Sequence, residues 1–300
     1  MEYDLRTLPK LRDGLSYMYF EHAKVEQDGL SISVFSPDGQ TQVPAAALGA
    51  LLLGPGTSLT HAAVKTLSEN GCLIIWTGEG TVRFYAQGLG ETRKGSHLET
   101  QAYLWADPKL HEQVVMRMYR MRFGCKLPAD LSLEQIRGME GARVRDAYAR
   151  ASAESGVKWE GRKYDRGNWY NTDHVNRALS AANACLYAVC HTAIVCGGYS
   201  PGLGFIHKGK SLSFIYDIAD LYKVDTTIPL SFRLAKDKPE QFESEVRREC
   251  RDVFRKTHLL EKVLPDIDRL FDLNISEDSL GWDIDVDPAR PTPYWDSPQD

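Results

Sequence analysis

The chain has 300 residues, of which 43% are hydrophobic, and a formal net charge of -5. This length can bury one large core or two ordinary ones, and no apolar run approaches the roughly 18 residues that a membrane-spanning helix needs. We therefore expect a soluble protein without a membrane partner. The charged start, MEYDLRTLPKLRDG, lacks the apolar stretch of a secretory signal, so we expect a cytoplasmic location.

The negative charge is concentrated at the C-terminal end of the chain. Residues 275–300 contain seven acidic residues and one basic residue, whereas residues 117–166 contain twelve basic and seven acidic residues. Phosphate binding depends on the local potential within a Debye length of about 10 Å, so the net charge does not exclude a nucleic-acid binder. Helices whose arginines merely face solvent explain the same distribution equally well.

Residues 1–87 are predicted to form a small β-rich domain. Gln27-Asp28-Gly29 and Pro37-Asp38-Gly39 suit hairpin turns, because Asp and Gly tolerate the backbone angles of tight turns. One helix is expected from about Thr60 to Asn70, with Gly71 placed for the left-handed conformation that ends a helix. Short segments rich in β-branched and aromatic residues predict the strands: SYMYFEHAKVEQ, LSISVFS, TQVPAAA, CLIIWT and TVRFYAQ.

Residues 88–274 are predicted to form a larger, all-α domain, which makes the expected fold class two-domain α+β. Ser132 and Gln135 match a capping box, and the helix that they begin extends to about residue 155. The apolar segment from His174 to Cys196 predicts a central buried helix that ends at Gly197-Gly198. Further helices are expected at 211–223, 240–264 and 265–274. Residues 275–300, with four prolines and no periodicity, predict a disordered acidic tail.

The cysteines indicate buried thiols rather than a zinc site. None of the six forms a CxxC pair, and three lie in one apolar helical segment, which fits small buried side chains and a reducing cytoplasm. They are Cys72, Cys125, Cys185, Cys190, Cys196 and Cys250.

Residues of the types that bind hard metal ions are the most informative feature of the chain. Glu140 interrupts the apolar stripe of a long helix, and His207 follows a Gly- and Pro-rich loop. Asp217 and Asp220 lie on one side of the next helix, where they repel each other unless a metal ion, a nearby cation or protonation compensates. Carboxylates and an imidazole can hold the divalent cation that attack on a phosphodiester needs. Spacing alone does not place Glu140 near the others.

Each of these residues also has a purely structural explanation. Glu140 could pair with Arg137 or Arg143 on its own helix. The two aspartates could pair with Lys223 or Arg233. His207 could be a loop histidine with satisfied hydrogen bonds, and the spacing of the two aspartates recurs by chance.

Three segments resemble the signature blocks of the CRISPR adaptation integrase and are closest to its type I-E branch. They are RGMEGARVRDAYA (137–149), GYSPGLGFIHKGKSLSFIYDIADLYKVD (198–225) and EVRRECRDVFR (245–255). The likeness extends over roughly residues 8–273. This family of prokaryotic enzymes inserts spacers into CRISPR arrays, and its fold is an N-terminal β-domain followed by a helical domain.

The resemblance implies a role for each candidate residue. Glu140, His207 and Asp220 would bind Mg²⁺ or Mn²⁺ directly, and Asp217 would be a supporting catalytic carboxylate. The reaction would join the 3′-hydroxyl ends of short spacer-precursor DNA to the CRISPR repeat by transesterification, which needs no ATP. A general metal-dependent endonuclease for branched DNA and a non-catalytic DNA-binding scaffold are the alternatives. A scaffold has no need of carboxylates on apolar faces.

The resemblance also implies partners. Family members form homodimers through their β-domains and assemble with a dimer of a small second CRISPR adaptation protein. Their DNA partners are a double-stranded duplex with 3′ overhangs or splayed ends and the CRISPR leader-repeat. His22 stands where some type I-E relatives have a Tyr that stacks on the terminal base pair. The expected DNA-binding residues are His22, Lys65, Arg83, Lys223, Arg247 and Arg251.

Overall fold

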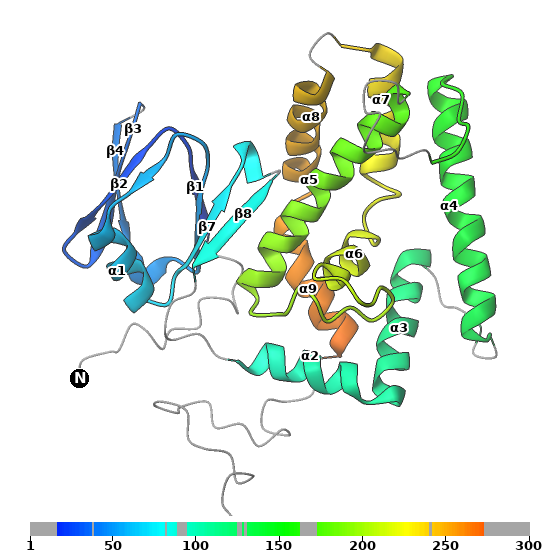
Figure 1. Ribbon diagram of the computed structural model, residues 1–300, viewed down its shortest axis with the longest axis horizontal. Coiled ribbons are helices and arrows are strands. Elements are labelled where there is room, and N and C mark those ends of the chain that lie inside the picture. Colours follow the sequence, from blue (N-terminus) through cyan, green and yellow to red (C-terminus); the bar gives the residue numbers. More distant parts are fainter. Residues whose placement is uncertain are drawn as a thin grey trace, which may run out of the picture.

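The computed structural model describes residues 17–272 except residues 38, 82, 89–94, 125–127, 129–130, 163–172 and 240–241. The strands and the helix His61–Glu69 gather in one part of the molecule, and the later helices lie in the other (Figure 1). The predicted fold class, a strand-rich N-terminal region followed by helices, is confirmed. Its division into separate domains at residue 87 stays a prediction. The predicted acidic tail, 275–300, lies outside the described residues.

The described strands form two sheets. One has the order β1 (Tyr17–Phe20), β5 (Ala50–Leu53), β7 (Leu73–Thr77), β8 (Phe84–Gly88), and the other β4 (Gly39–Pro44), β3 (Ser31–Ser36), β2 (Lys24–Asp28), β6 (Ser58–Leu59). In the first sheet β1, β5 and β7 are parallel and β8 is antiparallel. Both predicted hairpins are confirmed, because β2 pairs with β3 and β3 with β4 in antiparallel register.

The predicted strand segment SYMYFEHAKVEQ divides between the two sheets. The chain turns at His22, whose φ of 50° is positive, so β1 and β2 pair with different partners. The central strand β5 was not predicted, because Ala50–Leu53 contains no β-branched residue and shows no alternation. It is buried on both faces. Leu51 and Leu53 face the core between the sheets, and Ala50 and Leu52 pack against the helical part.

The helix α1 (His61–Glu69) follows the sequence prediction. Thr60 accepts a hydrogen bond from the Ala63 amide at 3.3 Å, and Gly71 has a φ of 64°. Short 3-10 helices η2 (Ala45–Ala47) and η3 (Glu79–Thr81) complete the strand-rich region.

The helical region is built around α5. Its elements are α2 (Ser96–Ala106), α3 (Pro108–Phe123), α4 (Leu133–Ser155), α5 (His174–Cys196), α6 (Ser213–Ala219), α7 (Thr227–Asp237), α8 (Phe242–Lys256) and α9 (Leu259–Phe271). Helix α5 is long and apolar enough to cross a membrane, yet 67% of its apolar window is buried inside the protein. The prediction of a central buried helix is therefore confirmed. The described cysteines are buried, as expected; Cys125 lies outside the described residues.

Two predicted helix boundaries are wrong. Helix α6 ends at Ala219 rather than at residue 223, and turns follow. The boundary between the last two helices falls at His258, with a φ of 51°, and Pro265 lies inside α9. Val263 and Ile267, on either side of this proline, are fully buried, and their burial outweighs the backbone hydrogen bond that the proline removes.

Candidate functional site

Glu140 is positioned by the start of α4. The predicted capping box is present: the Ser132 hydroxyl accepts from the Gln135 amide at 3.2 Å, and the Gln135 side chain accepts from the Ser132 amide at 2.8 Å. Ile136 and Ala147 on the same face are buried, as the apolar stripe predicted. This packing carries Glu140 inward, so that its side chain is only 13% exposed.

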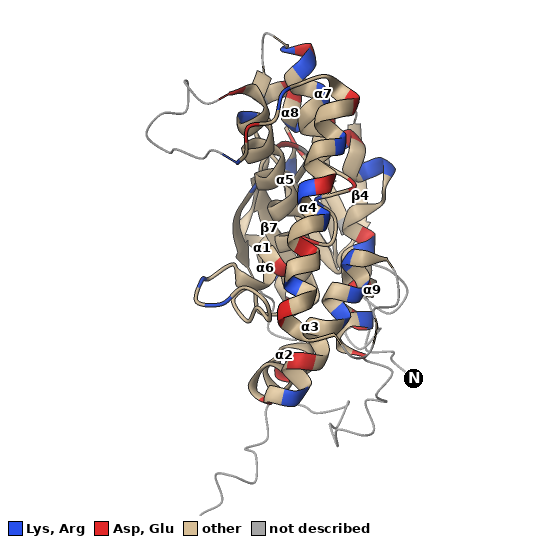
Figure 2. Ribbon diagram, turned by 90° about the vertical axis from the view of Figure 1, so that its right-hand side faces the viewer, with Lys and Arg blue, Asp and Glu red and all other residues tan. Residues whose placement is uncertain are grey.

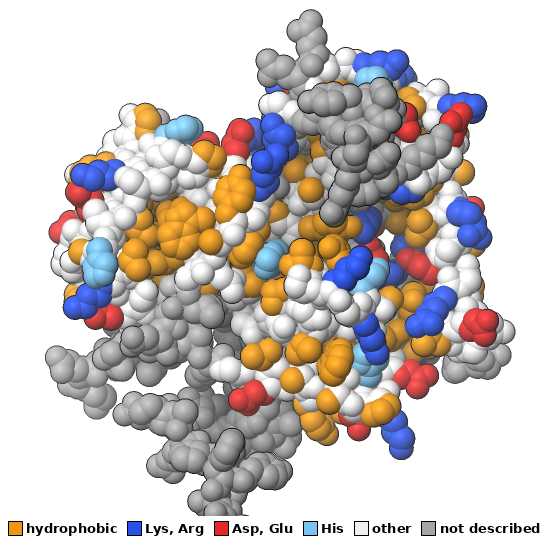
Figure 3. Space-filling view, in the orientation of Figure 1, with side chains coloured by type: hydrophobic (Ala, Val, Ile, Leu, Met, Phe, Trp, Pro, Cys, Tyr) orange, Lys and Arg blue, Asp and Glu red, His pale blue; other side chains and the backbone are white. Residues whose placement is uncertain are grey.

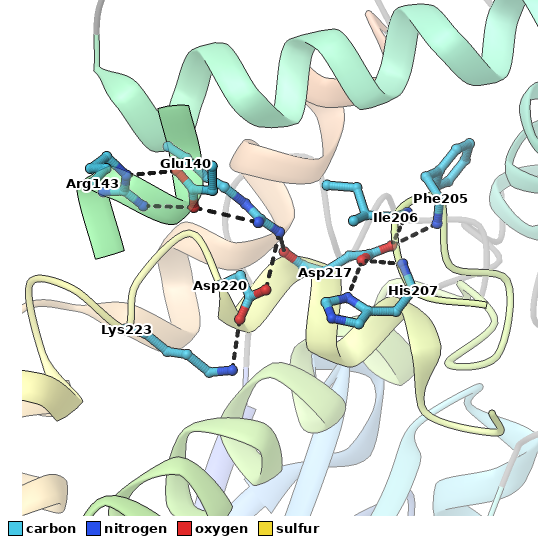
Figure 4. A network of polar contacts seen from close by, with 9 residues as sticks. Glu140, Arg143, Phe205, Ile206, His207, Asp217, Asp220 and Lys223 are labelled. Carbon is cyan, nitrogen blue, oxygen red and sulfur yellow. Dashed lines mark hydrogen bonds and ion pairs between the residues drawn. The ribbon is translucent and has the colours of Figure 1, made fainter. Parts of the chain in front are cut away.

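Asp217 binds the loop that carries His207. The carboxylate is fully buried and accepts hydrogen bonds from the backbone amides of Phe205 at 2.6 Å, Ile206 at 3.0 Å and His207 at 2.9 Å. One of its oxygens also lies 2.7 Å from His207 Nδ1 (Figure 4). A buried carboxylate with four such contacts is well compensated. These contacts fix the ring orientation of His207 and leave Nε2 as the ring nitrogen that does not contact Asp217.

The turn of this loop requires a glycine at position 204. A Cβ atom there would lie 2.4 Å from the His207 carbonyl oxygen and 2.7 Å from Ser213. The close approach of these backbones, which the Gly-rich sequence made possible, brings His207 over the start of α6.

Arg122 of α3 lies between the candidate carboxylates, and sequence reasoning missed it. Its side chain is 5% exposed, with Nη1 3.6 Å from Glu140 Oε1 and Nη2 3.3 Å from Asp220 Oδ2. Nη2 also donates to the Asp217 carbonyl oxygen at 3.3 Å. One signal was available: Arg122 continues the buried stripe of Val115, Met118 and Tyr119, just as Glu140 interrupts the stripe of α4.

Two further cations neutralise the carboxylates. Arg143 donates to Glu140 through Nε at 2.8 Å and Nη2 at 3.0 Å, and this hydrogen bonding raises the pKa of Arg143. Lys223 donates to Asp220 at 2.6 Å. Burial lowers the pKa of Lys223, but the charge of Asp220 and its hydrogen bond raise it above the usual value. The structural alternatives weighed for Glu140 and Asp220 are thus present, except that Arg233 pairs with Glu249.

The structure brings the four candidates into one network but not into one ligand cluster. Arg122 contacts both Glu140 and Asp220, whereas His207 contacts Asp217 (Figure 4). Among the described residues, no three His, Cys, Asp or Glu side chains lie close enough together to hold a metal ion. The donor types, carboxylate oxygens and an imidazole nitrogen, nevertheless suit Mg²⁺ or Mn²⁺.

A cavity of about 430 Å³ adjoins this network. It lies between α3, the start of α4 and the loop that carries His207, and Arg137 and Lys208 contribute positive charge to its wall. Basic, acidic and His side chains gather on this helical part of the surface (Figure 3). Figure 2 shows both signs of charge interspersed along α4, so the Arg-rich segment does not present a purely basic stripe.

The expected DNA-binding residues lie on several elements. His22, in the turn between β1 and β2, packs its ring against Gly56, and Arg83 is exposed just before β8. On α8, Arg251 pairs with Glu79 at 2.6 Å. The remaining three are Lys65, which pairs with Glu69 on α1 at 3.7 Å, Lys223 in the network above, and Arg247 on α8.

Comparison with known proteins defines the class. Residues 120–261 match the family model described as CRISPR associated protein Cas1. The chain is 54% identical to "CRISPR-associated endonuclease Cas1 2" of Thermus thermophilus over 98% of its length and 90% of that protein's. It is 42% identical to the Cas1 endonuclease of Geobacter sulfurreducens, covering 89% of this chain and 87% of that one.

A solved structure agrees with this match. The crystal structure of the TtCas1–DNA complex superposes with a TM-score of 0.83 at 56% identity, covering 88% of this chain and 99% of that one. The chain therefore belongs to the Cas1 family of CRISPR-associated endonucleases.

Proposed function

We propose that this protein is a metal-dependent DNA integrase of CRISPR adaptation. It joins the 3′-hydroxyl ends of short spacer-precursor DNA to the CRISPR repeat by transesterification. The observation that carries the proposal is the network of Glu140, Asp217, Asp220 and His207, drawn from two helices and a loop around one buried arginine. Membership of the Cas1 family and similarity to a Cas1 protein solved with DNA support the same substrate class.

Glu140, Asp220 and His207 would hold Mg²⁺ or Mn²⁺. When bound, the ion would polarise a phosphoryl oxygen and favour the alkoxide form of the attacking 3′-hydroxyl. Asp217 keeps the His207 ring in place through Nδ1, which leaves Nε2 for the ion. Arg143 and Lys223, which pair with Glu140 and Asp220, would contact an incoming phosphate.

Outside the site, basic residues would contact the DNA phosphates. We assign these contacts to Lys65, Arg83, Arg247 and Arg251, with Lys223 at the site itself and His22 stacking on the end of the duplex. Duplex length, 3′ overhangs or splayed ends, and the shape of the leader-repeat then guide recognition more than base-by-base contacts.

The proposed assembly contains more than one chain. We propose that two chains form a homodimer through their strand-rich regions and that a dimer of the small second adaptation protein joins them. We place this assembly in the prokaryotic cytoplasm and assign the protein to the type I-E branch of the family. Exposed hydrophobic side chains on the strands, Phe35, Trp76 and Tyr85, favour a protein partner there.

Reaction products separate this proposal from the alternative of a general endonuclease for branched DNA. The protein is incubated with a leader-repeat duplex, a labelled short duplex and Mg²⁺. We expect label joined to the repeat, because a 3′-hydroxyl replaces water as the nucleophile. Products that consist only of shortened strands would favour the nuclease, and binding without any product would favour the scaffold.

Single substitutions assign the roles. Glu140→Ala, His207→Ala and Asp220→Ala should each abolish joining while DNA affinity stays within a few-fold, because Lys and Arg contacts to phosphates dominate affinity. Glu134→Ala, an exposed acid on the same helix as Glu140, is the matched control and should join normally. Full activity in any one of the three variants would remove that residue from the site.

A further inference from the structure

Arg122 is held less tightly than the other cations of the site. Its guanidinium lies 3.6 Å from Glu140 and 3.3 Å from Asp220, whereas Arg143 and Lys223 make contacts of 2.6 to 3.0 Å. Among the described residues, the buried Nε of Arg122 has no hydrogen-bond partner. Charge-assisted hydrogen bonds of full strength are shorter, so this guanidinium spans two carboxylates without an optimal bond to either.

Its position is nevertheless specific. Of the three cations, Arg122 is the one that pairs with both Glu140 of α4 and Asp220, the residue that follows α6. Burial also matters, because removing this buried cation would leave Glu140 with Arg143 and Asp220 with Lys223 but no cation between the two carboxylates. Arg122 thus lies between two of the three proposed metal ligands.

The formal charges of the network cancel. Three carboxylates, Glu140, Asp217 and Asp220, are matched in number by three cations, Arg122, Arg143 and Lys223. The cations contact the side chains of Glu140 and Asp220, whereas the Asp217 carboxylate contacts backbone amides and His207. A divalent cation entering this neutral group adds two positive charges at short range, which is unfavourable in a partly buried site. The phosphates of a DNA strand would supply the missing negative charge.

We propose that Arg122 is a positioning residue that acts as a built-in counter-ion of the acidic pair. In the free protein it keeps Glu140 and Asp220 together and competes with divalent cations for them. Metal binding is consequently coupled to DNA binding, because the phosphates compensate the added charge. The inference rests on the proposed function and adds to it an order of assembly, with DNA promoting metal binding.

Calorimetric titration of the full chain with Mn²⁺ tests this coupling. The titration is made without DNA and with a short duplex that has splayed ends and is blocked at its 3′-hydroxyls. The protein should bind Mn²⁺ weakly alone and more tightly with the duplex. Arg122→Gln should bind Mn²⁺ about tenfold more tightly than the parent without DNA, and should gain less from the duplex.

Two measurements distinguish competition from a merely structural role. The melting temperature of metal-free Arg122→Gln should fall and should recover on addition of Mn²⁺, because the ion replaces the missing cation. Arg122→Lys, for use should the first variant not fold, keeps one charge but cannot span both carboxylates, so its Mn²⁺ affinity should be intermediate.

Arg117→Gln is the matched control on the same helix. Arg117 is half-buried and donates to the Leu270 carbonyl at 2.5 Å, away from the acidic pair, so its replacement should leave Mn²⁺ affinity unchanged.

Equal or weaker Mn²⁺ binding by Arg122→Gln would overturn the inference and leave the proposed function intact. Absence of Mn²⁺ binding in every variant, with and without the duplex, would overturn the proposed metal site as well.

Discussion

Asp217 and Asp220 are only three residues apart in the sequence, but their environments in the structure differ. Asp217 is fully buried and contacts three amides and an imidazole, whereas Asp220 is 20% exposed and faces Arg122 and Lys223. The first carboxylate therefore builds the loop that carries His207, and the second is available for exchange between cations. This difference supports the assignment of Asp217 as the supporting carboxylate.

Replacement of Asp217 by asparagine tests this structural role. The variant keeps the side-chain shape but replaces an accepting oxygen with an amino group that faces backbone N–H donors. We expect the free energy of unfolding to fall by about 2–4 kcal/mol, since charge-assisted hydrogen bonds are lost and donors are left unpaired. Urea unfolding measures the change. Asp225→Asn, at an exposed position, should change stability by less than about 0.5 kcal/mol. Equal stability of the two variants would show that Asp217 does not hold the loop.

At the scale of single elements, local signals predicted boundaries well. Helices α1 and α4 begin directly after Thr60 and Ser132, whose side chains cap the first turn. Such caps can be recognised from residues that are close together in the sequence. Strand β5 escaped prediction because burial on both faces erases the alternation that identifies a strand. The end of α8 escaped because no glycine or proline marks His258.

The residues of the candidate site also divide into those that local sequence signals identify and those that depend on tertiary packing. Glu140 and Asp217 could be chosen from the sequence, since an acidic residue on an apolar helix face is visible locally. Arg122 could not be assigned a partner, because its contacts with Glu140, Asp217 and Asp220 depend on how α3 packs against α4 and α6. The pairing of Arg251 with Glu79, 172 residues away, was equally inaccessible.

The ion pair between Glu79 of η3 and Arg251 of α8 leads to a prediction about DNA affinity. Hydrogen bonding by Arg251 lowers the pKa of Glu79. The Glu79 carboxylate therefore competes with DNA phosphates for Arg251, which we assign to DNA binding. Glu79→Gln should therefore tighten duplex binding by about two- to tenfold at moderate salt and steepen its salt dependence. Fluorescence anisotropy over a salt series measures both quantities.

Glu26→Gln is the control for this prediction, because Glu26 pairs with Lys24 within the second sheet at 2.7 Å, at a residue not assigned to DNA. Its duplex affinity should change little. Weaker binding by Glu79→Gln than by the parent would mean that Glu79 positions Arg251 for DNA instead of competing with it.

At the scale of the whole molecule, α5 joins the strand-rich and helical parts. Val195 and Cys196 at its end pack on Ala50 and Leu52 of β5. One turn earlier His191 stacks on Phe84 of β8, with ring centroids 3.7 Å apart. The junction thus combines apolar contacts, which do not respond to pH, with the titratable ring of His191.

His191 should make this junction sensitive to acid. Burial lowers the pKa of His191 from its usual 6.5 to about 4, so the folded protein favours the neutral ring. The unfolded chain binds a proton more readily between these values. The contribution of His191 to stability is therefore complete above about pH 6.5 and is lost as pH falls toward 4. After allowance for partial exposure, this loss amounts to about 1–2 kcal/mol.

His191→Phe keeps a ring that can stack on Phe84 but cannot take a proton. Its loss of unfolding free energy between pH 7 and pH 5 should be smaller than that of the parent by about 1 kcal/mol, as measured by urea unfolding at both pH values. His61→Gln, at an exposed position at the start of α1, should keep the parent's pH dependence. If His191→Phe and the parent lost stability in parallel, the acid sensitivity would have to arise elsewhere, and His191 would serve at this junction only as a packed ring.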